Sequence, residues 1–138
     1  MSNEGYITYH LSEIRRGTKV DYEIRLATGG EIPQALDLAW RMFVKYDAPD
    51  YGAEHTERMR VAIEDRLKDL SIYSERLMVV ALVDGNVIGM LETYVTNRIS
   101  LLFVDSEHQR KGIATALMDK IAGELKVRGY DKIVLNAS

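Results

Sequence analysis

The sequence contains no cysteine and only two prolines among its 138 residues. The absence of cysteine excludes disulfide bonds, thiolate zinc sites and a cysteine nucleophile, and it agrees with a reducing compartment. The three histidines, His10, His55 and His108, do not have metal-ligand spacing. We therefore expect no metal site in this chain.

Long apolar runs are also missing. No stretch approaches the roughly 18 residues that a membrane span requires, and the first residues lack the basic-then-apolar order of a signal peptide. The formal net charge of -3 argues against a nucleic-acid binder that relies on bulk electrostatics. These absences predict a cytoplasmic protein with no membrane or nucleic-acid partner.

The composition that remains is that of an ordinary globular protein, with 46% hydrophobic and 28% charged residues. The length suits one domain with one core. No internal repeat or linker divides the chain. We place the domain at residues 20–138 and interpret residues 1–19 as an N-terminal arm or an extra strand.

Hydrophobic periodicity predicts the order strand, helix, helix, three strands, helix, strand. Alternation over residues 20–27 indicates the first strand. One-sided apolar spacing indicates helices over residues 32–46 and 54–70. Between these helices we predict a loop with Pro49 and Gly52 as breakers.

The second half of the chain begins with a hairpin signal. Two apolar runs flank Asp84-Gly85-Asn86, and further strands are predicted over residues 98–104 and 131–136, with a helix over 111–128 between them. The central strands must be antiparallel, whereas the final strand-helix-strand favours a right-handed parallel crossover. We therefore predict an α/β fold in the broad sense, with a mixed α+β sheet and helices packed on its faces.

The junction between the strand over 98–104 and the next helix has the properties of an anion site. A helix N-terminus presents unpaired N–H groups and a positive partial charge. Gly112 leaves room for close approach of a ligand, and Arg110 and Lys111 add positive charge. The same turn is also compatible with a plain strand-to-helix connection that binds no ligand, and it matches neither G-x-x-x-x-G-K-[ST] nor G-x-G-x-x-G.

The stretch Gln109-Arg110-Lys111-Gly112-Ile113-Ala114 resembles the Q/R-x-x-G-x-G/A loop of the GCN5-related N-acetyltransferases, the GNAT superfamily. The order of elements over residues 20–138 is similar to that superfamily as well. The resemblance implies the GNAT fold and transfer of an acetyl group from acetyl-CoA to a primary amine of a small molecule or a protein. It implies acetyl-CoA as the cosubstrate and no metal.

The resemblance also implies which residues bind acetyl-CoA. In the family the loop amides hold the pyrophosphate, and the strand before the loop pairs its main chain with the pantetheine arm. That strand and the next parallel one splay apart, with the acetyl group in the gap. A residue at the end of the last strand often contacts the arm, although a polar residue that merely closes the strand is equally compatible. The positions so implicated are Leu102, Phe103, Val104, Gln109, Arg110, Lys111, Gly112, Ile113, Ala114, Thr115 and Asn136.

The catalytic residues implied by the family are harder to place. Direct attack of a neutral amine requires a general base, and main-chain N–H groups can stabilise the oxyanion. A common position for the base holds Arg98, which cannot accept a proton near neutral pH. Glu92 is the substitute, with Tyr94 on the same strand face. A solvated or salt-bridged Glu92, and His108 as the base, are the alternatives.

Two further features bear on function. Residues 45–58 are acidic and aromatic, and we interpret them as a polar interhelix loop, with a site for a cationic amine as the alternative. Family members usually continue past the last strand with another helix and two strands, so we expect either a truncated version of a longer protein or a shortened fold. Residues 133–136 would then form a bare apolar edge that favours a homodimer or strand exchange. A non-catalytic CoA-binding module, or an interaction domain whose loop binds nothing, are the alternatives to an enzyme.

Overall fold

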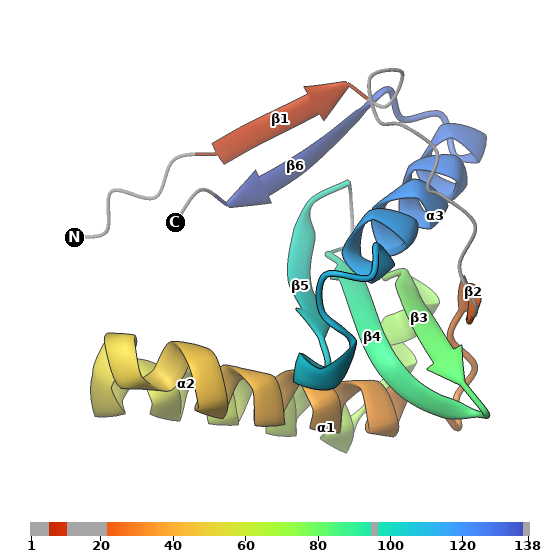
Figure 1. Ribbon diagram of the computed structural model, residues 1–138. Coiled ribbons are helices and arrows are strands. Elements are labelled where there is room, and N and C mark those ends of the chain that lie inside the picture. Colours follow the sequence, from red (N-terminus) through yellow and green to blue (C-terminus); the bar gives the residue numbers. More distant parts are fainter. Residues whose placement is uncertain (1–5, 11–21, 95–96, 137–138) are drawn as a thin grey trace.

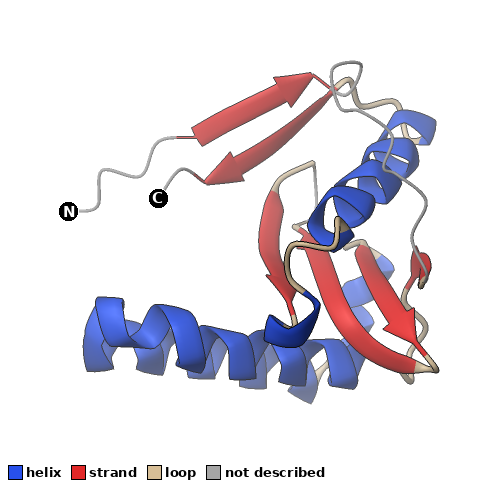
Figure 2. Ribbon diagram, in the orientation of Figure 1, coloured by secondary structure: helices blue, strands red, loops and turns tan. Residues whose placement is uncertain are grey.

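The computed structural model describes residues 6–10, 22–94 and 97–136 (Figure 1). Figure 2 separates its helices from its strands. From residue 22 onward, strands and α-helices follow in the predicted order. The elements are the strands β1 (Tyr6–His10), β2 (Glu23–Leu26), β3 (Met78–Val83), β4 (Asn86–Thr93), β5 (Ile99–Val104) and β6 (Lys132–Asn136), the α-helices α1 (Ile32–Met42), α2 (Ala48–Lys68) and α3 (Ile113–Val127), the π-helix η2 (Phe43–Asp47), and the 3-10 helices η3 (Leu70–Ser74) and η4 (Ser106–His108).

The main sheet has four antiparallel strands in the order β2-β3-β4-β5. The hairpin between β3 and β4 confirms the turn predicted from the sequence. Asp84 and Gly85 both have positive φ, 51° and 80°, as the two central residues of a type I′ turn require. This turn lies between Val83 and Asn86, which pair with each other.

Helices cover both faces of this sheet (Figures 1 and 2). Successive side chains of β3 alternate between the two cores, since strand residues point to opposite faces. Val80 packs in the cluster that contains α1 and Ile63 of α2, and Val79 packs in the cluster that contains α3. Both valines are fully buried. The sheet is therefore the middle layer of a three-layer arrangement.

The prediction of a loop between the first two helices is wrong. Helix α1 continues directly into η2, which continues into α2. Pro49 lies in the first turn of α2, where its missing N–H has no intrahelical partner to lose. Gly52 has a non-helical conformation, with φ 83° and ψ 177°. Glycine tolerates this positive φ, and α2 is kinked at Gly52 rather than interrupted by a loop.

Strand β6 also differs from the prediction. Instead of a parallel ladder with β5, it forms an antiparallel pair with β1, from Tyr6 opposite Asn136 to His10 opposite Lys132. Its pairing with the strand region of β5 is reduced, among the described residues, to one isolated parallel bridge between Arg98 and Val134. The expectation of a bare edge at residues 133–136 is therefore wrong, because β1 occupies that edge.

Within the part of the chain that the structure describes, no helix is both long and apolar enough to cross a membrane.

Candidate functional site

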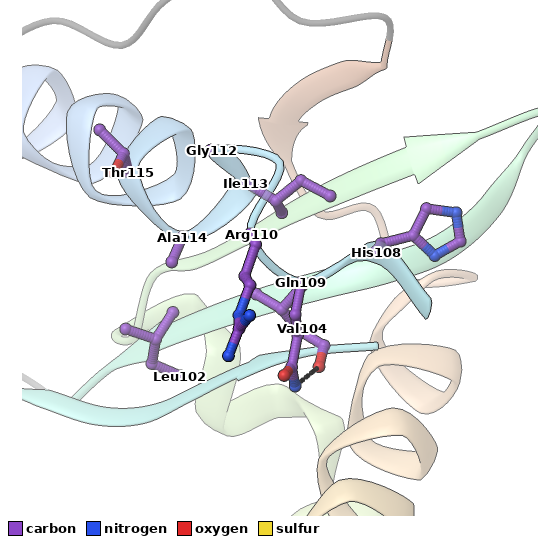
Figure 3. Close-up of a pocket in the computed structure, with 9 residues that line it drawn as sticks. All are labelled: Leu102, Val104, His108, Gln109, Arg110, Gly112, Ile113, Ala114 and Thr115. Atoms are coloured by element: carbon purple, nitrogen blue, oxygen red, sulfur yellow. Dashed lines mark hydrogen bonds between the residues drawn. The ribbon is translucent and has the colours of Figure 1, made fainter. Parts of the chain in front are cut away.

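A pocket of about 460 Å³ lies where the end of β5 meets the start of α3 (Figure 3). The strand contributes two alternate residues, and the loop and first helical turn contribute the others. The lining residues are Leu102, Val104, His108, Gln109, Arg110, Gly112, Ile113, Ala114 and Thr115. Most residues expected to bind acetyl-CoA are thus brought together around one pocket.

The backbone at the start of α3 leaves amide groups open toward this pocket. Gly112 is the N-cap, with φ 79° and ψ 10°, and no side chain caps the helix there. The first intrahelical bond runs from the Ala116 N–H to the Gly112 carbonyl, 3.0 Å away. The N–H groups of the three residues between them therefore have no partner in the preceding turn, which is the arrangement that stabilises an anion.

Gln109 and Arg110, which precede Gly112 in the loop, shape the rim of the pocket. The Gln109 side chain turns back along the strand, and its Nε2 donates to the Val104 carbonyl, 3.1 Å away (Figure 3). Arg110 has φ 65°, an unusual value for a residue with a side chain. Its guanidinium extends into the space between Leu102 and Gln109 (Figure 3). The loop thus places a positive charge over the pocket.

Three of the expected cosubstrate residues do not line this pocket. Phe103 points to the other face of β5 and packs against the core under α1 and α2. Lys111 is exposed at the loop. The main chain of Asn136 pairs with Tyr6 in β1, and its side chain lies outside what the structure describes.

His108 lines the pocket and is held by its neighbour. Its Nδ1 lies 2.9 Å from Oδ2 of Asp105. This hydrogen bond to His108, together with the bond from the Glu107 N–H, outweighs burial and lowers the pKa of the Asp105 carboxyl. The next residue, Ser106, accepts a hydrogen bond from Lys45 Nζ at 3.2 Å. The segment before the loop is therefore tied to η2.

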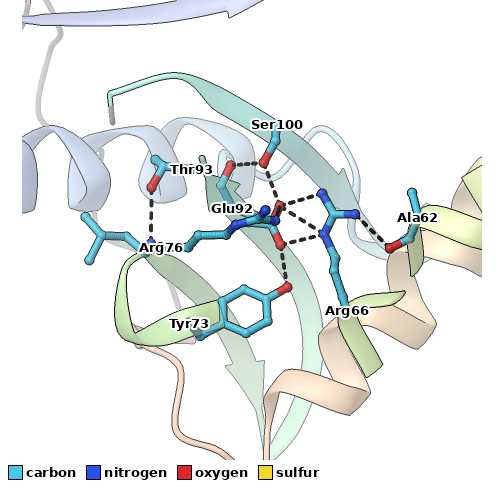
Figure 4. Close-up of polar contacts among 8 residues, drawn as sticks. Ala62, Arg66, Tyr73, Arg76, Glu92, Thr93 and Ser100 are labelled. Carbon is cyan, nitrogen blue, oxygen red and sulfur yellow. Dashed lines mark hydrogen bonds and ion pairs between the residues drawn. The ribbon is translucent and has the colours of Figure 1, made fainter. Parts of the chain in front are cut away.

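Glu92 of β4 lies at the centre of a buried polar cluster, where α2 and η3 pack against the main sheet (Figure 4). Its side chain is 0% exposed. Arg66 donates to both carboxylate oxygens, with Nη2 2.9 Å from Oε1 and Nε 2.9 Å from Oε2. The Ser100 hydroxyl donates to Oε1 at 2.6 Å, and the Tyr73 hydroxyl donates to Oε2.

These contacts decide the protonation state of Glu92. Burial raises the pKa of its carboxyl, but the hydrogen bonds and charge of Arg66, with the bonds from Ser100 and Tyr73, outweigh burial and lower it. Burial and the neighbouring carboxylate raise the pKa of Tyr73. Glu92 is thus an ion-paired carboxylate with no solvent contact, the salt-bridged alternative given above. These surroundings oppose a role as general base.

Tyr94 is close to this cluster but does not join it. It is 46% exposed, and its ring centroid lies 4.4 Å from the guanidinium carbon of Arg76. Arg76 Nη1 in turn lies 3.7 Å from Glu92 Oε1. The structure therefore connects the two predicted catalytic residues through an arginine.

Sequence reasoning missed the partners of Glu92. Arg66, Tyr73 and Ser100 come from α2, η3 and β5, and none belongs to a local motif with Glu92. One signal was present, because Arg66 lies on the otherwise apolar stripe of its helix. An arginine at such a position indicates a buried acidic partner.

No group of three or more histidine, aspartate or glutamate side chains that could hold a metal ion occurs among the residues described.

Comparisons with solved structures support this fold. A GCN5-related N-acetyltransferase from Rhodopseudomonas palustris is similar with a TM-score of 0.69 at 19% identity, over 82% of this chain and 71% of that one. The PaiA N-acetyltransferase of Thermoplasma acidophilum, solved in complex with coenzyme A, is similar with a TM-score of 0.64 at 22% identity, over 80% and 75%. At these identities the likeness establishes the fold alone.

A third structure covers more of this chain. It is a functionally unknown conserved protein from Staphylococcus epidermidis, with a TM-score of 0.67 at 18% identity, over 97% of this chain and 50% of that one. The present chain therefore spans half the length of that protein. No curated protein matches the sequence significantly.

The family itself is identified by sequence. Residues 47–138, more than half of the chain, match the acetyltransferase (GNAT) domain. The match includes β5, the loop at Gly112 and helix α3, which are the elements that form the pocket. The chain therefore belongs to the GNAT acetyltransferase family.

Proposed function

We propose that the protein transfers an acetyl group from acetyl-CoA to a primary amine by direct attack of the amine on the thioester. The observation that carries this proposal is the pocket between β5 and α3, with its uncapped helix N-terminus and its overlying Arg110. Membership of the GNAT family supplies the reaction class.

The pyrophosphate of CoA fits the loop on electrostatic grounds. The N–H groups of Ile113, Ala114 and Thr115 can donate to phosphate oxygens, and Gly112 contributes no side chain that would block them. Arg110 can add charge-assisted hydrogen bonds from the rim. The proposal therefore assigns the anionic part of the cosubstrate to the start of α3.

The pantetheine arm is assigned to the edge of β5 that faces away from β4. Leu102 and Val104 lie beside the pocket on this strand. Beyond the bridge at Arg98, no ladder to β6 is formed by the described residues of β5. An extended ligand can pair with such a free edge as an added strand.

The chemistry requires a neutral amine. Its nitrogen forms a bond to the thioester carbon, the carbon–sulfur bond breaks, and the electron pair leaves with the CoA thiolate while the amine proton passes to a base. Glu92 is poorly suited to accept this proton, because its carboxylate is buried and ion-paired. Tyr94 remains the predicted catalytic residue that is open to solvent.

The second candidate function is a CoA-binding module without catalysis. The observation that favours it is the same buried Glu92, since the carboxylate predicted to act as base is engaged by Arg66, Ser100 and Tyr73. Both candidates require CoA to bind, and they differ only in the transfer step.

Thermal unfolding with and without acetyl-CoA tests the shared requirement. A ligand that binds only the native state raises stability by about 2.7 kcal/mol at a hundredfold excess over its Kd. Gly112→Glu places bulk and negative charge at the helix N-terminus and should abolish the shift. Gly123→Glu is the matched control, because it makes the same change further along α3, where an added Cβ meets nothing within 4 Å.

If acetyl-CoA stabilises Gly112→Glu as much as the wild type, the assignment of CoA to this pocket is contradicted. Release of free thiol from acetyl-CoA across a panel of amines then separates the enzyme from the binding module. Thiol release that depends on one class of amine supports the transferase. Binding without release under any amine supports the module.

A further inference from the structure

Asn97, two residues before β5, makes two hydrogen bonds to the start of β6. Its side-chain Nδ2 donates to the Lys132 carbonyl, 2.6 Å away. Its own carbonyl accepts a hydrogen bond from the Val134 N–H at 3.0 Å. Asn97 therefore grips the β6 backbone on both sides of Ile133.

Ile133 is held from the opposite direction as well. Its side chain is 0% exposed and belongs to the core cluster under α3, with Ile121 and Leu125. The beginning of β6 is thus fixed by two hydrogen bonds to its backbone and one buried side chain. Further along the strand, Leu135 packs at the edge of the same cluster, and β6 pairs with β1 over its whole length.

From this point β5 and β6 separate. The isolated bridge between Arg98 and Val134 directly follows Asn97, and the two strands then diverge toward their C-terminal ends (Figure 1). Beyond the bridge, β6 takes its described ladder partners from β1. Asn97 therefore lies next to the bridge from which the two strands diverge (Figure 1).

Further along the chain, β5 leads toward the pocket at the start of α3. Leu102 and Val104, further along β5, line that pocket. At about 3.3 Å per residue, Leu102 lies about 13 Å along the strand from Arg98. Beyond Val134 the described residues of β6 pair with β1, in a two-stranded sheet separate from the main one. A small change in the direction of β6 at Asn97 therefore becomes a larger displacement further along the strand.

We propose that Asn97 is a positioning residue that sets the direction of β6 relative to β5 and so the fit of the pantetheine arm of CoA. This inference rests on the proposed function, because it assumes that CoA binds with its arm along β5. Asn97 contacts neither the pocket nor the loop. It acts through the direction of β6, while the loop at Gly112 holds the phosphates independently.

The test compares two ligands, one with the pantetheine arm and one without it. CoA contains the nucleotide, the pyrophosphate and the arm, whereas adenosine 3′-phosphate 5′-diphosphate contains only the nucleotide half. Asn97→Asp keeps the shape of the side chain but replaces the donor to the Lys132 carbonyl with a carboxylate oxygen. Asn86→Asp makes the same change at the exposed start of β4 and serves as the matched control.

Calorimetric titration should give a Kd for CoA that rises roughly five- to tenfold in Asn97→Asp, as expected for one lost hydrogen bond. The Kd for the nucleotide half should stay within about twofold of the wild type. Asn86→Asp should bind both ligands as the wild type does. A general loss of structure would weaken both ligands together, so the ratio of the two Kd values reports the specific effect.

Equal weakening of both ligands, or no weakening of either, overturns the inference. Wild-type protein that binds neither ligand instead refutes the proposed function, so the two failures are distinguishable. Should Asn97→Asp fail to fold, Asn97→Ala removes the same donor without adding charge and is measured in the same way. Its CoA-specific loss is again the required result.

Discussion

Arg66 of α2 and Glu92 of β4, 26 residues apart in the chain, form a bidentate ion pair inside the protein. The arginine side chain is 13% exposed and the glutamate 0%. The pair fastens α2 to β4 of the main sheet. The carboxylate with the most obvious acid–base chemistry on β4 is therefore engaged in an ion pair that stabilises the fold.

Removal of the Glu92 charge should destabilise the protein strongly. Glu92→Gln leaves the Arg66 guanidinium buried without its counter-charge, which we expect to cost about 3 kcal/mol in the free energy of unfolding. Urea unfolding measures this change in the free energy of unfolding. Glu57→Gln, which breaks an exposed pair with Arg60, should leave the urea midpoint nearly unchanged. Equal effects of the two substitutions would contradict the assignment of a buried pair.

The same pair should make stability depend on pH in the acid range. The pKa of Glu92 is lower in the folded protein than in the unfolded chain, so the folded state binds the proton less readily. Its stabilisation is fully present above the unfolded pKa of about 4.3 and is lost as the pH falls through the lower folded value. Urea unfolding measured from pH 6 to pH 3 should show that the difference in free energy of unfolding between wild type and Glu92→Gln shrinks below about pH 4.3. A difference that stays constant with pH would mean that the Glu92 pKa is not lowered.

Gly89→Ala should disturb the core and the pocket together. A Cβ at this position of β4 would lie 2.9 Å from Cγ2 of Ile113 and 3.3 Å from Cδ1 of Leu117. Because Ile113 is the first residue of α3, its displacement shifts the helix N-terminus. We expect a loss of about 1–3 kcal/mol in stability and weaker CoA binding, measured by unfolding and by titration. Gly123→Ala on the open side of α3 should impair neither.

Arg110→Gly should separate backbone strain from ligand binding. Arg110 has φ 65°, a conformation that costs a residue with a side chain about 1–2 kcal/mol. Glycine relieves this cost but loses more chain entropy on folding, so stability should rise slightly or stay level. Loss of the cation should raise the Kd for CoA, more at low salt than at high salt. A variant that binds CoA as tightly as the wild type at low salt would exclude Arg110 from the site.

Much of the secondary structure could be predicted because it depends on short-range patterns. The Asp84-Gly85 turn follows from two residues with positive φ, and the core face of α3 follows from the spacing of Ile113, Leu117, Ile121 and Leu125. The exception is the segment around Gly52. There a proline and a glycine predicted a loop. In the structure the proline lies in the first turn of α2 and the glycine forms a kink, so the segment is helical.

The candidate pocket was also predictable from local sequence, since its loop, its glycine and the following helix are consecutive in the chain. The surroundings of Glu92 were not. Its partners Arg66, Tyr73 and Ser100 are 26, 19 and 8 residues away, and only the packing of α2, η3 and β5 against β4 brings them to one carboxylate.

The sequence by itself therefore determined the order of elements, the position of the loop at Gly112 and the family, because each is carried by residues close together along the chain. The tertiary structure alone decided that Glu92 is a buried ion-pair partner, that β6 pairs with β1, and that Asn97 hydrogen-bonds to the start of β6. These features depend on contacts between distant segments, which exist only once the helices have packed on the sheet.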